Sequence, residues 1–165
     1  MDILATPETG YIGRFAPSPT GPLHFGSLVA AVASYLEARS QQGLWRLRIE
    51  DLDPARESVS AATEIIQQLE RHGLNWDGDI LYQSERLDSY EQARDQLTLQ
   101  GSLYPCTGTR KETDRIYSGR CRNKTISDLS QPHSLRFHIN ESELTIQDKL
   151  FGELQWTKHR DMGDF

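Results

Sequence analysis

Residues 11–27 read Tyr-Ile-Gly-Arg-Phe-Ala-Pro-Ser-Pro-Thr-Gly-Pro-Leu-His-Phe-Gly-Ser, and this stretch decides the fold of the N-terminal part of the chain. Its first six residues, Tyr11 to Ala16, form a short apolar run that predicts a β-strand. Three prolines and a glycine then interrupt the run. Beyond them, Leu23 to Arg39 carries apolar residues at helical spacing, which predicts a helix. The stretch therefore predicts a strand, a rigid turn and a helix in succession.

A helix that starts directly after a strand is suited to bind a phosphate. Its first backbone N–H groups have no partner inside the helix, and its dipole is positive at that end. His24, one turn from the expected start, could donate to a phosphate oxygen. Gly26 would let a phosphate or a flat ring lie against the backbone, because it has no Cβ. The alternative is a proline-rich turn that binds nothing.

Two longer strings carry a resemblance to a known family. Residues 13–27 match Gly-Arg-Phe-Ala-Pro-Ser-Pro-Thr-Gly-x-Leu-His-x-Gly-Ser, which resembles the first signature of class I aminoacyl-tRNA synthetases in its glutamate-specific form. His24-Phe25-Gly26-Ser27 stands there in place of His-Ile-Gly-His. Residues 48–56, Arg-Ile-Glu-Asp-Leu-Asp-Pro-Ala-Arg, resemble the second block of the glutamyl-tRNA synthetases. By spacing alone, the carboxylates Glu50, Asp51 and Asp53 fit a metal site, an amine site or a solvated turn.

The resemblance implies a set of site residues. His24, Gly26 and Ser27 belong to the catalytic side that faces the phosphates and the adenosine of ATP. The substrate side comprises Arg14, Phe15, Ala16, Pro17, Ser18 and Glu50. Glu50 would face the α-amino group of L-glutamate, since a buried carboxylate and an ammonium stabilise each other. Arg14 would pair with the side-chain carboxylate, and Mg²⁺ would accompany the ATP.

The rest of the chain alternates predicted strands and helices, which indicates an α/β fold. The expected elements are a strand at Leu44–Ile49, helices at Ser60–His72 and Leu87–Gln100, and strands at Leu135–Ile139 and within Leu144–Trp156. The resemblance narrows this class to the first half of a Rossmann-like class I synthetase catalytic domain with a basic, cysteine-containing insertion. The expected division is 1–102 for the catalytic half, 103–130 for the insertion and 131–165 for strands returning to the catalytic domain.

Both cysteines lie in the insertion. Cys106-Thr107-Gly108, Tyr117 and Cys121 resemble the zinc loop of the glutamyl-queuosine tRNA(Asp) synthetases, whose pattern is Cys-x-Cys, then Tyr, then Cys four residues later. The resemblance implies Cys106, Tyr117 and Cys121 as metal ligands. Gly108 stands where the second cysteine belongs. Structural zinc sites normally have four ligands, so we expect Zn²⁺ to bind weakly.

The insertion is also basic in an otherwise acidic chain. Residues 103–124 contain six Lys and Arg residues against two acidic ones, while the whole chain of 165 residues has a net charge of -6. The basic run fits either a solvated loop or a contact with tRNA phosphates. The net charge argues against indiscriminate nucleic-acid binding. No apolar run approaches the roughly 20 residues that span a bilayer, and the N-terminus lacks the pattern of a signal peptide, so we expect a cytoplasmic protein without a membrane partner.

The function implied by the resemblance is activation of L-glutamate with ATP and its transfer to the queuosine base of tRNA(Asp). The amino-acid sequence of residues 24–36 resembles this branch more than ordinary glutamyl-tRNA synthetases. Two alternatives stay open: a fragment of a glutamyl-tRNA synthetase that charges the tRNA 3′ end, and a non-catalytic remnant that binds RNA. A monomer is expected for the full-length protein.

Overall fold

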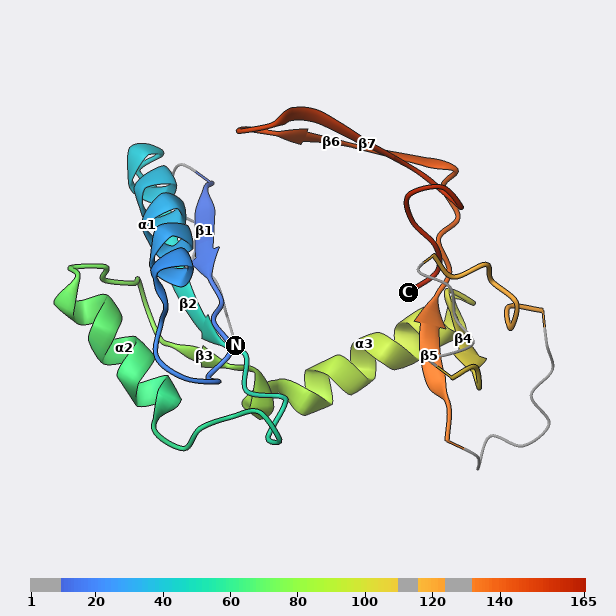
Figure 1. Ribbon diagram of the computed structural model, residues 1–165, viewed down its shortest axis with the longest axis horizontal. Helices are drawn as coiled ribbons and strands as arrows, with labels where there is room; N and C mark the ends of the chain where they lie inside the picture. The colour runs from blue at the N-terminus through green and yellow to red at the C-terminus, as the bar shows by residue number, and fades with distance from the viewer. Residues whose placement is uncertain (1–9, 110–115, 124–131) are drawn as a thin grey trace. The chain divides into compact units, whose positions relative to one another are not determined.

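A computed structural model describes residues 10–109, 116–123 and 132–165 (Figure 1). Its elements fall into two compact units, Met1–Leu87 and Asp88–Phe165, which are described separately below. The three-part division expected from the sequence stays a prediction, and its boundary at residue 130 lies outside the described residues.

The first unit is built on a parallel three-stranded sheet. Its strands β1 (Ile12–Phe15), β2 (Leu44–Ile49) and β3 (Leu81–Tyr82) lie side by side in chain order. Parallel neighbours need a long crossover, and helices α1 (Phe25–Ser40) and α2 (Ala61–Arg71) supply the two that are required. The sequence prediction of an α/β fold is thereby confirmed.

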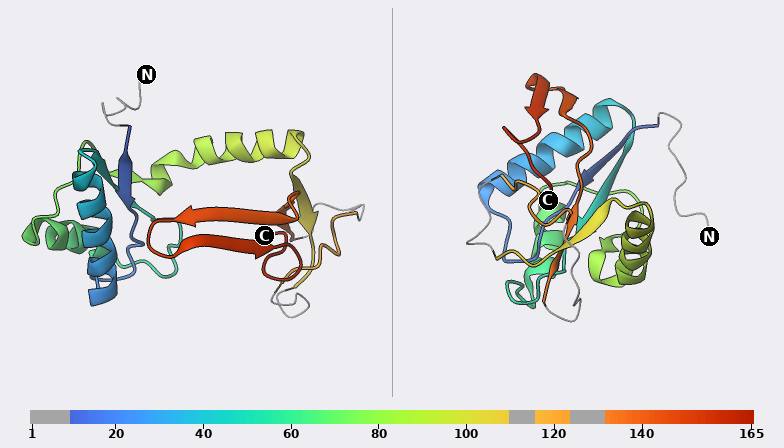
Figure 2. Two further views of the ribbon diagram at one scale, coloured as in Figure 1. Left: turned by 90° about the horizontal axis from the view of Figure 1, so that it is seen from above. Right: turned by 90° about the vertical axis from the view of Figure 1, so that its right-hand side faces the viewer.

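Both helices pack against one face of this sheet (Figure 2). Side chains alternate along a strand, so every second residue of β1 and β2 is buried under the helices and the others face away. The core comprises Phe15, Ala31, Ala38, Trp45, Leu47, Ile49, Ile65, Leu69 and Leu74. The opposite face carries Ile12, Arg14, Arg46 and Arg48, of which the first two are exposed.

Helix α1 packs through its small residues rather than its large apolar ones. Ala31 and Ala38 are fully buried, whereas Val29, Val32 and Leu36 are exposed. The close approach depends on Gly13 of β1, where an added Cβ would lie 3.0 Å from the Cβ of Ala38. Helical spacing therefore predicted the helix correctly without showing which face packs on the sheet. In α2, by contrast, the expected apolar face is the buried one, with Ile65 and Leu69 fully covered.

The second unit contains antiparallel strand pairs. The short helix η1 (Gln83–Arg86), which still belongs to the first unit, leads into α3 (Leu87–Leu99). After it, β4 (Leu103–Cys106) pairs with β5 (Ser134–Phe137), and β6 (Glu143–Asp148) forms a hairpin with β7 (Gly152–Thr157). The strands expected near residues 135 and 144–156 are thus confirmed. No helix within the described parts of the chain is long and apolar enough to cross a membrane.

A buried carboxylate organises this unit. The Asp164 side chain is fully buried and accepts hydrogen bonds from the Tyr104 hydroxyl at 2.6 Å, from Arg122 at 2.5 and 2.9 Å and from the Ile139 amide at 3.1 Å. Burial raises the pKa of this carboxyl, but the hydrogen bonds from Tyr104, Arg122 and Ile139 outweigh burial and hold it below its usual value. Burial and then the hydrogen bond with Asp164 raise the pKa of Tyr104. Asp164 therefore ties the chain end to β4 and to the segment around Arg122.

Candidate active site

The turn between β1 and α1 ends at His24, which is the N-cap of α1. Its backbone is extended (ψ 169°), and its Nδ1 accepts a hydrogen bond from the Ser27 amide at 3.3 Å. The helix therefore begins at Phe25, two residues later than the sequence pattern suggested. Because Nδ1 is the acceptor, the proton of the neutral ring lies on Nε2. The exposed imidazole thus keeps one N–H donor free to reach a ligand at the helix start.

Gly26 leaves room for the His24 ring. A Cβ at this position would lie 3.1 Å from Cε1 and 3.2 Å from Nδ1 of His24. Any side chain at 26 would therefore press on the imidazole. The expectation that Gly26 also admits a ligand against the backbone stays a prediction.

A pocket of about 450 Å³ lies over this turn. Most of the predicted site residues line it: Phe15, Ala16, Pro17, Ser18, His24, Gly26 and Ser27, together with Thr20, Gly21, Pro22, Leu23 and Ala30. Phe15 is itself part of the core, where it stacks on Trp45 with ring centroids 6.3 Å apart. The pocket wall is therefore continuous with the packed interior, which fixes its shape.

Hydrogen bonds from three other segments fix the turn. The Glu50 amide donates to the Pro17 carbonyl and the Ser58 amide to the Pro19 carbonyl, both at 3.0 Å. The Leu23 amide donates to Oε1 of Gln68 on α2 at 2.7 Å. Sequence reasoning missed Gln68. The feature of the sequence that could have indicated this role is the position of Gln68 next to the apolar Leu69, on the inward side of the expected helix.

The three carboxylates after β2 each have a different partner and do not form one cluster. Glu50 pairs with Arg48 at 2.5 Å, and Asp53 pairs with Arg56 at 2.5 Å. Asp51 accepts from the amide and the hydroxyl of Ser84, at 3.0 and 2.5 Å. Burial raises the pKa of Asp51, yet the Ser84 hydrogen bonds outweigh it and lower this pKa. The geometry therefore does not support the metal-site alternative.

Glu50 keeps acceptor capacity despite its ion pair. A carboxylate has about four lone-pair sites, and Arg48 occupies Oε1. The Glu50 side chain is 32% exposed, so the second oxygen can accept from an ammonium group while Arg48 stays in place. The structure is compatible with the predicted amine contact without testing it.

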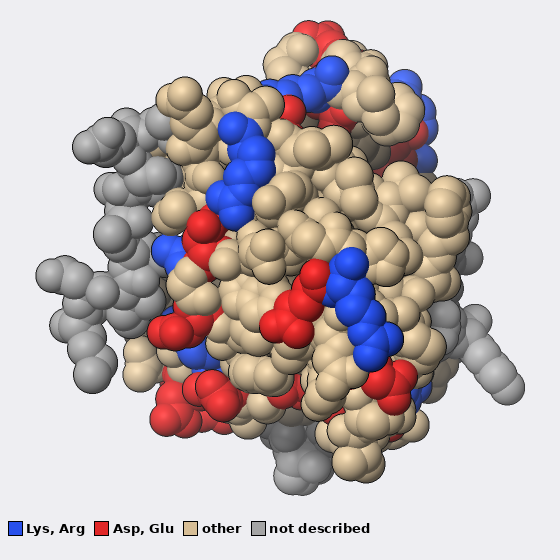
Figure 3. Space-filling model, turned by 90° about the vertical axis from the view of Figure 1, so that its left-hand side faces the viewer, with Lys and Arg blue, Asp and Glu red and all other residues tan. Residues whose placement is uncertain are grey.

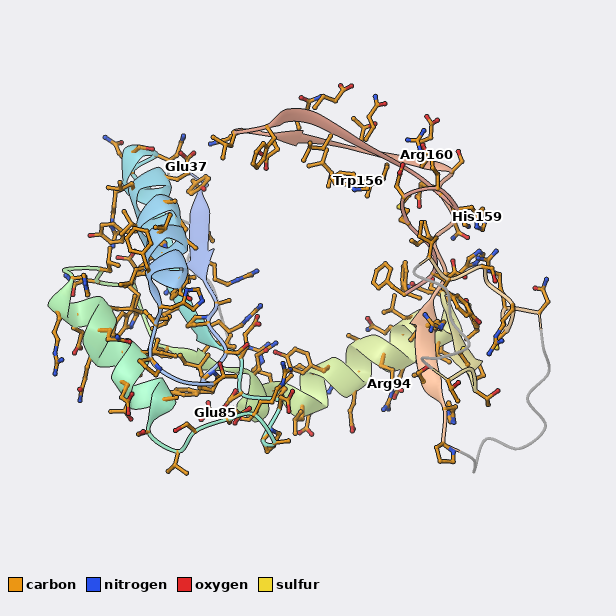
Figure 4. All side chains as sticks on the ribbon, viewed as in Figure 1. Glu37, Glu85, Arg94, Trp156, His159 and Arg160 are labelled. Atoms are coloured by element: carbon orange, nitrogen blue, oxygen red, sulfur yellow. The ribbon has the colours of Figure 1, made fainter. Side chains whose placement is uncertain are left out.

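Arg14 lies on the other face of β1, away from the His24 pocket. It lines a second pocket of about 480 Å³ with Arg46, Arg48, Arg86, Asp79, Glu85 and five other residues; Figure 4 labels Glu85 on the η1 turn. Within the described residues Arg14 makes no hydrogen bond or ion pair. The Nε atoms of Arg46 and Arg48 are buried without a partner. The guanidinium of Arg14, which has no partner within the described residues, is suited to bind a carboxylate in this pocket.

The three predicted metal ligands do lie together in the second unit. Cys106 Sγ and the Tyr117 hydroxyl are 3.3 Å apart, and the Cys121 amide donates to that hydroxyl at 3.0 Å. Burial raises the pKa of Cys106, but hydrogen bonds from Tyr117, Arg136, the Gly108 backbone and Cys121 lower it to about 7. Burial and the contact with Cys106 raise the pKa of Tyr117 to about 12. Within the described ranges, no group of three or more His, Cys, Asp or Glu residues could hold a metal ion, so the zinc prediction is not supported.

The basic run is only partly described. Arg110, Lys111, Arg115 and Lys124 lie outside the described residues, so the structure does not decide between a solvated loop and an RNA contact. Arg122 is engaged with Asp164. On the face shown in Figure 3, basic and acidic side chains form small mixed groups, and most of the surface carries neither.

Comparison with known proteins gives the class that this fold and site define. The model of the tRNA synthetases class I (E and Q) catalytic domain matches residues 12–164. The chain belongs to this family. Solved structures agree: a glutamate tRNA ligase from Elizabethkingia meningosepticum, in complex with its amino acid, matches with a TM-score of 0.76 and 26% identity over 88% of this chain and 36% of that one. A glutamate-tRNA synthetase from Elizabethkingia anophelis matches with a TM-score of 0.77.

The similar curated proteins indicate one branch of this family. The glutamyl-Q tRNA(Asp) synthetase of Pseudomonas putida is 45% identical over 168 aligned residues, which cover all of this chain and 55% of that protein. Those of Thiobacillus denitrificans and Klebsiella pneumoniae are 46% and 48% identical over 93% and 89% of this chain. The chain spans about half the length of these relatives. The individual roles assigned to the site residues stay predictions.

Proposed function

We propose that this chain forms the glutamate- and ATP-binding half of a glutamyl-Q tRNA(Asp) synthetase. The complete protein would activate L-glutamate with ATP and transfer it to the queuosine base of tRNA(Asp). The observation that carries the proposal is the 45% identity to proteins of that name along the entire chain. The pocket over the capped start of α1 supports it, because most of the residues implied by the family resemblance line that pocket.

Activation is an in-line displacement. A carboxylate oxygen of glutamate forms a bond to the α-phosphorus of ATP, while the bond from that phosphorus to the bridging oxygen breaks and pyrophosphate leaves with the electron pair. No residue of the protein becomes covalently attached. Positioning of the two reactants and stabilisation of the charge that develops on the phosphoryl oxygens supply the rate.

His24 and the first turn of α1 act on the phosphate side. The Nε2–H of His24 donates to a phosphate oxygen, in the tautomer set by the Ser27 amide. The unpaired amides at the helix start add a positive field in the same direction. Mg²⁺ bound to the triphosphate supplies further positive charge.

Arg14 and Glu50 act on the glutamate side. The guanidinium of Arg14, which has no partner within the described residues, binds the side-chain carboxylate. The free oxygen of Glu50 accepts from the α-ammonium group. Arg46, Arg48 and Arg86 border the pocket that Arg14 lines and outnumber its acidic residues Asp79 and Glu85, which favours an acidic substrate over a neutral one. In the second reaction, a nucleophile on the queuosine base attacks the activated carbonyl and AMP leaves. We further propose that the full-length protein is a cytoplasmic monomer.

The test is ATP–pyrophosphate exchange by the chain extended to the length of its relatives. Exchange should require L-glutamate and proceed without tRNA. His24→Ala removes both the donor and the helix cap, whereas His24→Asn keeps a capping oxygen and removes the ring donor. Both should slow exchange by roughly 10²–10³, the scale for one transition-state donor, while only His24→Ala should lower the stability of the fold, by about 1 kcal/mol.

His72→Ala is the matched control, since His72 is an exposed histidine at the end of α2. Its exchange rate should stay within about twofold of the unaltered protein. Exchange supported equally by glutamine or aspartate would refute the role of Arg14, which is assigned to the side-chain carboxylate. A His24→Asn variant with an unchanged rate would refute the role of His24.

A second candidate is a glutamate-tRNA ligase that charges the tRNA 3′ end. The similarity to the Elizabethkingia glutamate-tRNA ligases favours it. Transfer of labelled glutamate to tRNA(Asp) from which the 3′-terminal adenosine has been removed separates the two. Only transfer to the queuosine base survives that change.

A further inference from the structure

The cysteine cluster of the second unit (Cys106, Tyr117 and Cys121) brings potential zinc ligands together but lacks the ligand number and the negative charge of a zinc site. Cys106 and Cys121 are buried, at 1% and 3% exposure, and both contact the Tyr117 hydroxyl. A structural zinc site needs four ligands, and thiolate ligands carry negative charge that balances the metal. Among the described residues, three candidate ligands lie together here: Cys106, Tyr117 and Cys121.

A guanidinium lies where the side chain of a fourth ligand would begin. Gly108 has no side chain, and a Cβ built on it would lie 2.7 Å from Nη2 of Arg120 and 3.4 Å from both Cζ and Nε. The Arg120 guanidinium therefore occupies the space that a cysteine side chain at 108 would need. A positive charge at this point repels a divalent cation instead of binding it.

A second guanidinium lies over the ring of Tyr117. The Cζ atom of Arg136 lies 3.8 Å from the centroid of the Tyr117 ring, which is cation–π geometry. Its Nη1 donates to the Asp164 carbonyl at 3.2 Å. Asp164, the one buried carboxylate among the described residues, is already engaged by Arg122 and Tyr104. Two guanidinium groups thus lie near the cluster, and this carboxylate is not available to neutralise a metal ion.

We propose that this cluster is a metal-free replacement for a zinc site, in which the Arg120 guanidinium takes the place of the fourth ligand and excludes zinc. Hydrogen bonds among Cys106, Tyr117 and Cys121, together with Arg136 on the ring, then maintain the local fold. The proposal concerns the fold of the second unit and does not rest on the catalytic assignment.

The experiment measures metal binding by four forms of the 165-residue chain: the unaltered protein, Gly108→Cys, Gly108→Cys/Arg120→Gln and Gly108→Cys/Arg160→Gln. Arg160, labelled in Figure 4, is an exposed arginine of the same unit that pairs with Asp161. The last form therefore removes one positive charge whose ion pair is with Asp161 and not with Cys106, Tyr117 or Cys121. Zinc content after dialysis against a mild chelator and the thiolate absorption of added Co²⁺ give two readouts.

The unaltered protein should retain no zinc, and a strong chelator should leave its melting temperature unchanged. Gly108→Cys should bind Co²⁺ only weakly, because Arg120 still occupies the site. Gly108→Cys/Arg120→Gln should bind it at least about tenfold more tightly than either Gly108→Cys or the Arg160 control, a difference of about 1.4 kcal/mol. It should also melt higher with zinc.

Three results would overturn the proposal. One is a stoichiometric zinc ion in the unaltered protein. The second is Co²⁺ binding by Gly108→Cys as tight as that of the form without Arg120. The third is no gain in affinity when Arg120 is replaced. The measurement on the unaltered protein decides the first point even if a variant fails to fold.

Discussion

Asp164→Asn tests whether a single buried carboxylate organises the second unit. Asparagine has nearly the same shape, so the change removes the charge while leaving the packing intact. In the native protein the side chain is fully buried and accepts hydrogen bonds from Tyr104, Arg122 and the Ile139 amide. The substitution leaves the Arg122 charge without its partner and turns an amide N–H toward groups that are themselves donors.

The expected loss follows from these contacts. Breaking a buried ion pair by removing one partner typically costs about 3–5 kcal/mol. The Arg122 side chain is 25% exposed, so water partly solvates its charge once the carboxylate is gone. We therefore expect a loss near the lower limit, about 3 kcal/mol.

Native-state hydrogen exchange measures this loss locally. Peptides from β4 and β5 should exchange about 100-fold faster in Asp164→Asn, since each 1.4 kcal/mol is a factor of ten. Peptides from β1 and β2 in the first unit serve as the internal reference. The matched control is Asp95→Asn, which removes a carboxylate from an exposed ion pair with Arg94 on α3 and should change protection by less than about 0.5 kcal/mol.

The effect should also depend on pH in one direction. The pKa of Asp164 is lower in the folded protein than in the unfolded chain, where it is about 3.9. The unfolded state therefore takes up the proton first as pH falls. The stability contributed by Asp164 is fully present above about pH 4 and is lost as pH falls through the folded pKa. The ratio of exchange rates between variant and unaltered protein should shrink in that range. A variant as protected as the native chain at pH 7, or a ratio that stays constant on acidification, would refute the reasoning.

Three further outcomes are expected. Gly13→Val should lower the free energy of unfolding by about 1–3 kcal/mol in urea titrations, because its side chain would be forced against Ala38 of α1; an unchanged stability would show that α1 does not need the close approach. Leu69→Ala should cost about 2–5 kcal/mol in the same titrations, because Leu69 is fully buried, whereas Leu99→Ala at an exposed position should cost far less. The 165-residue chain, which spans about half of its relatives, should form glutamyl-adenylate in a single-turnover assay at least about tenfold more slowly than an extended form, and comparable rates would contradict the view that the site needs both halves.

Local features of the site could be read from the sequence. The strand, turn and helix of residues 11–40 follow from an apolar run, three prolines and helical periodicity, which act over a few residues. The motifs around His24 and Glu50 predicted the family correctly, since agreement over so many positions is not a matter of chance. The expected helix start was wrong by two residues, because the cap depends on the Nδ1 contact of His24 with Ser27.

Features that join distant residues could not be read in this way. Periodicity showed that α1 is a helix, but Gly13 and the two buried alanines decide which face packs on the sheet. Gln68 reaches the Leu23 amide across 45 residues of chain. Arg14 and Phe15 are neighbours in one motif but line different pockets, because successive side chains of a strand point to opposite faces, and the turn that carries His24 lies on the Phe15 side.

The sequence by itself determined the family, the α/β class and the residues implied by the resemblance, because all of these are encoded in short contiguous strings. It also showed that a zinc ligand is missing at Gly108. Only the tertiary structure decided what occupies that place, namely the Arg120 guanidinium, and that Tyr104 and Arg122 share the carboxylate of Asp164. Such contacts depend on how the backbone brings together side chains up to 60 residues apart, and no local pattern of residue types records that distance.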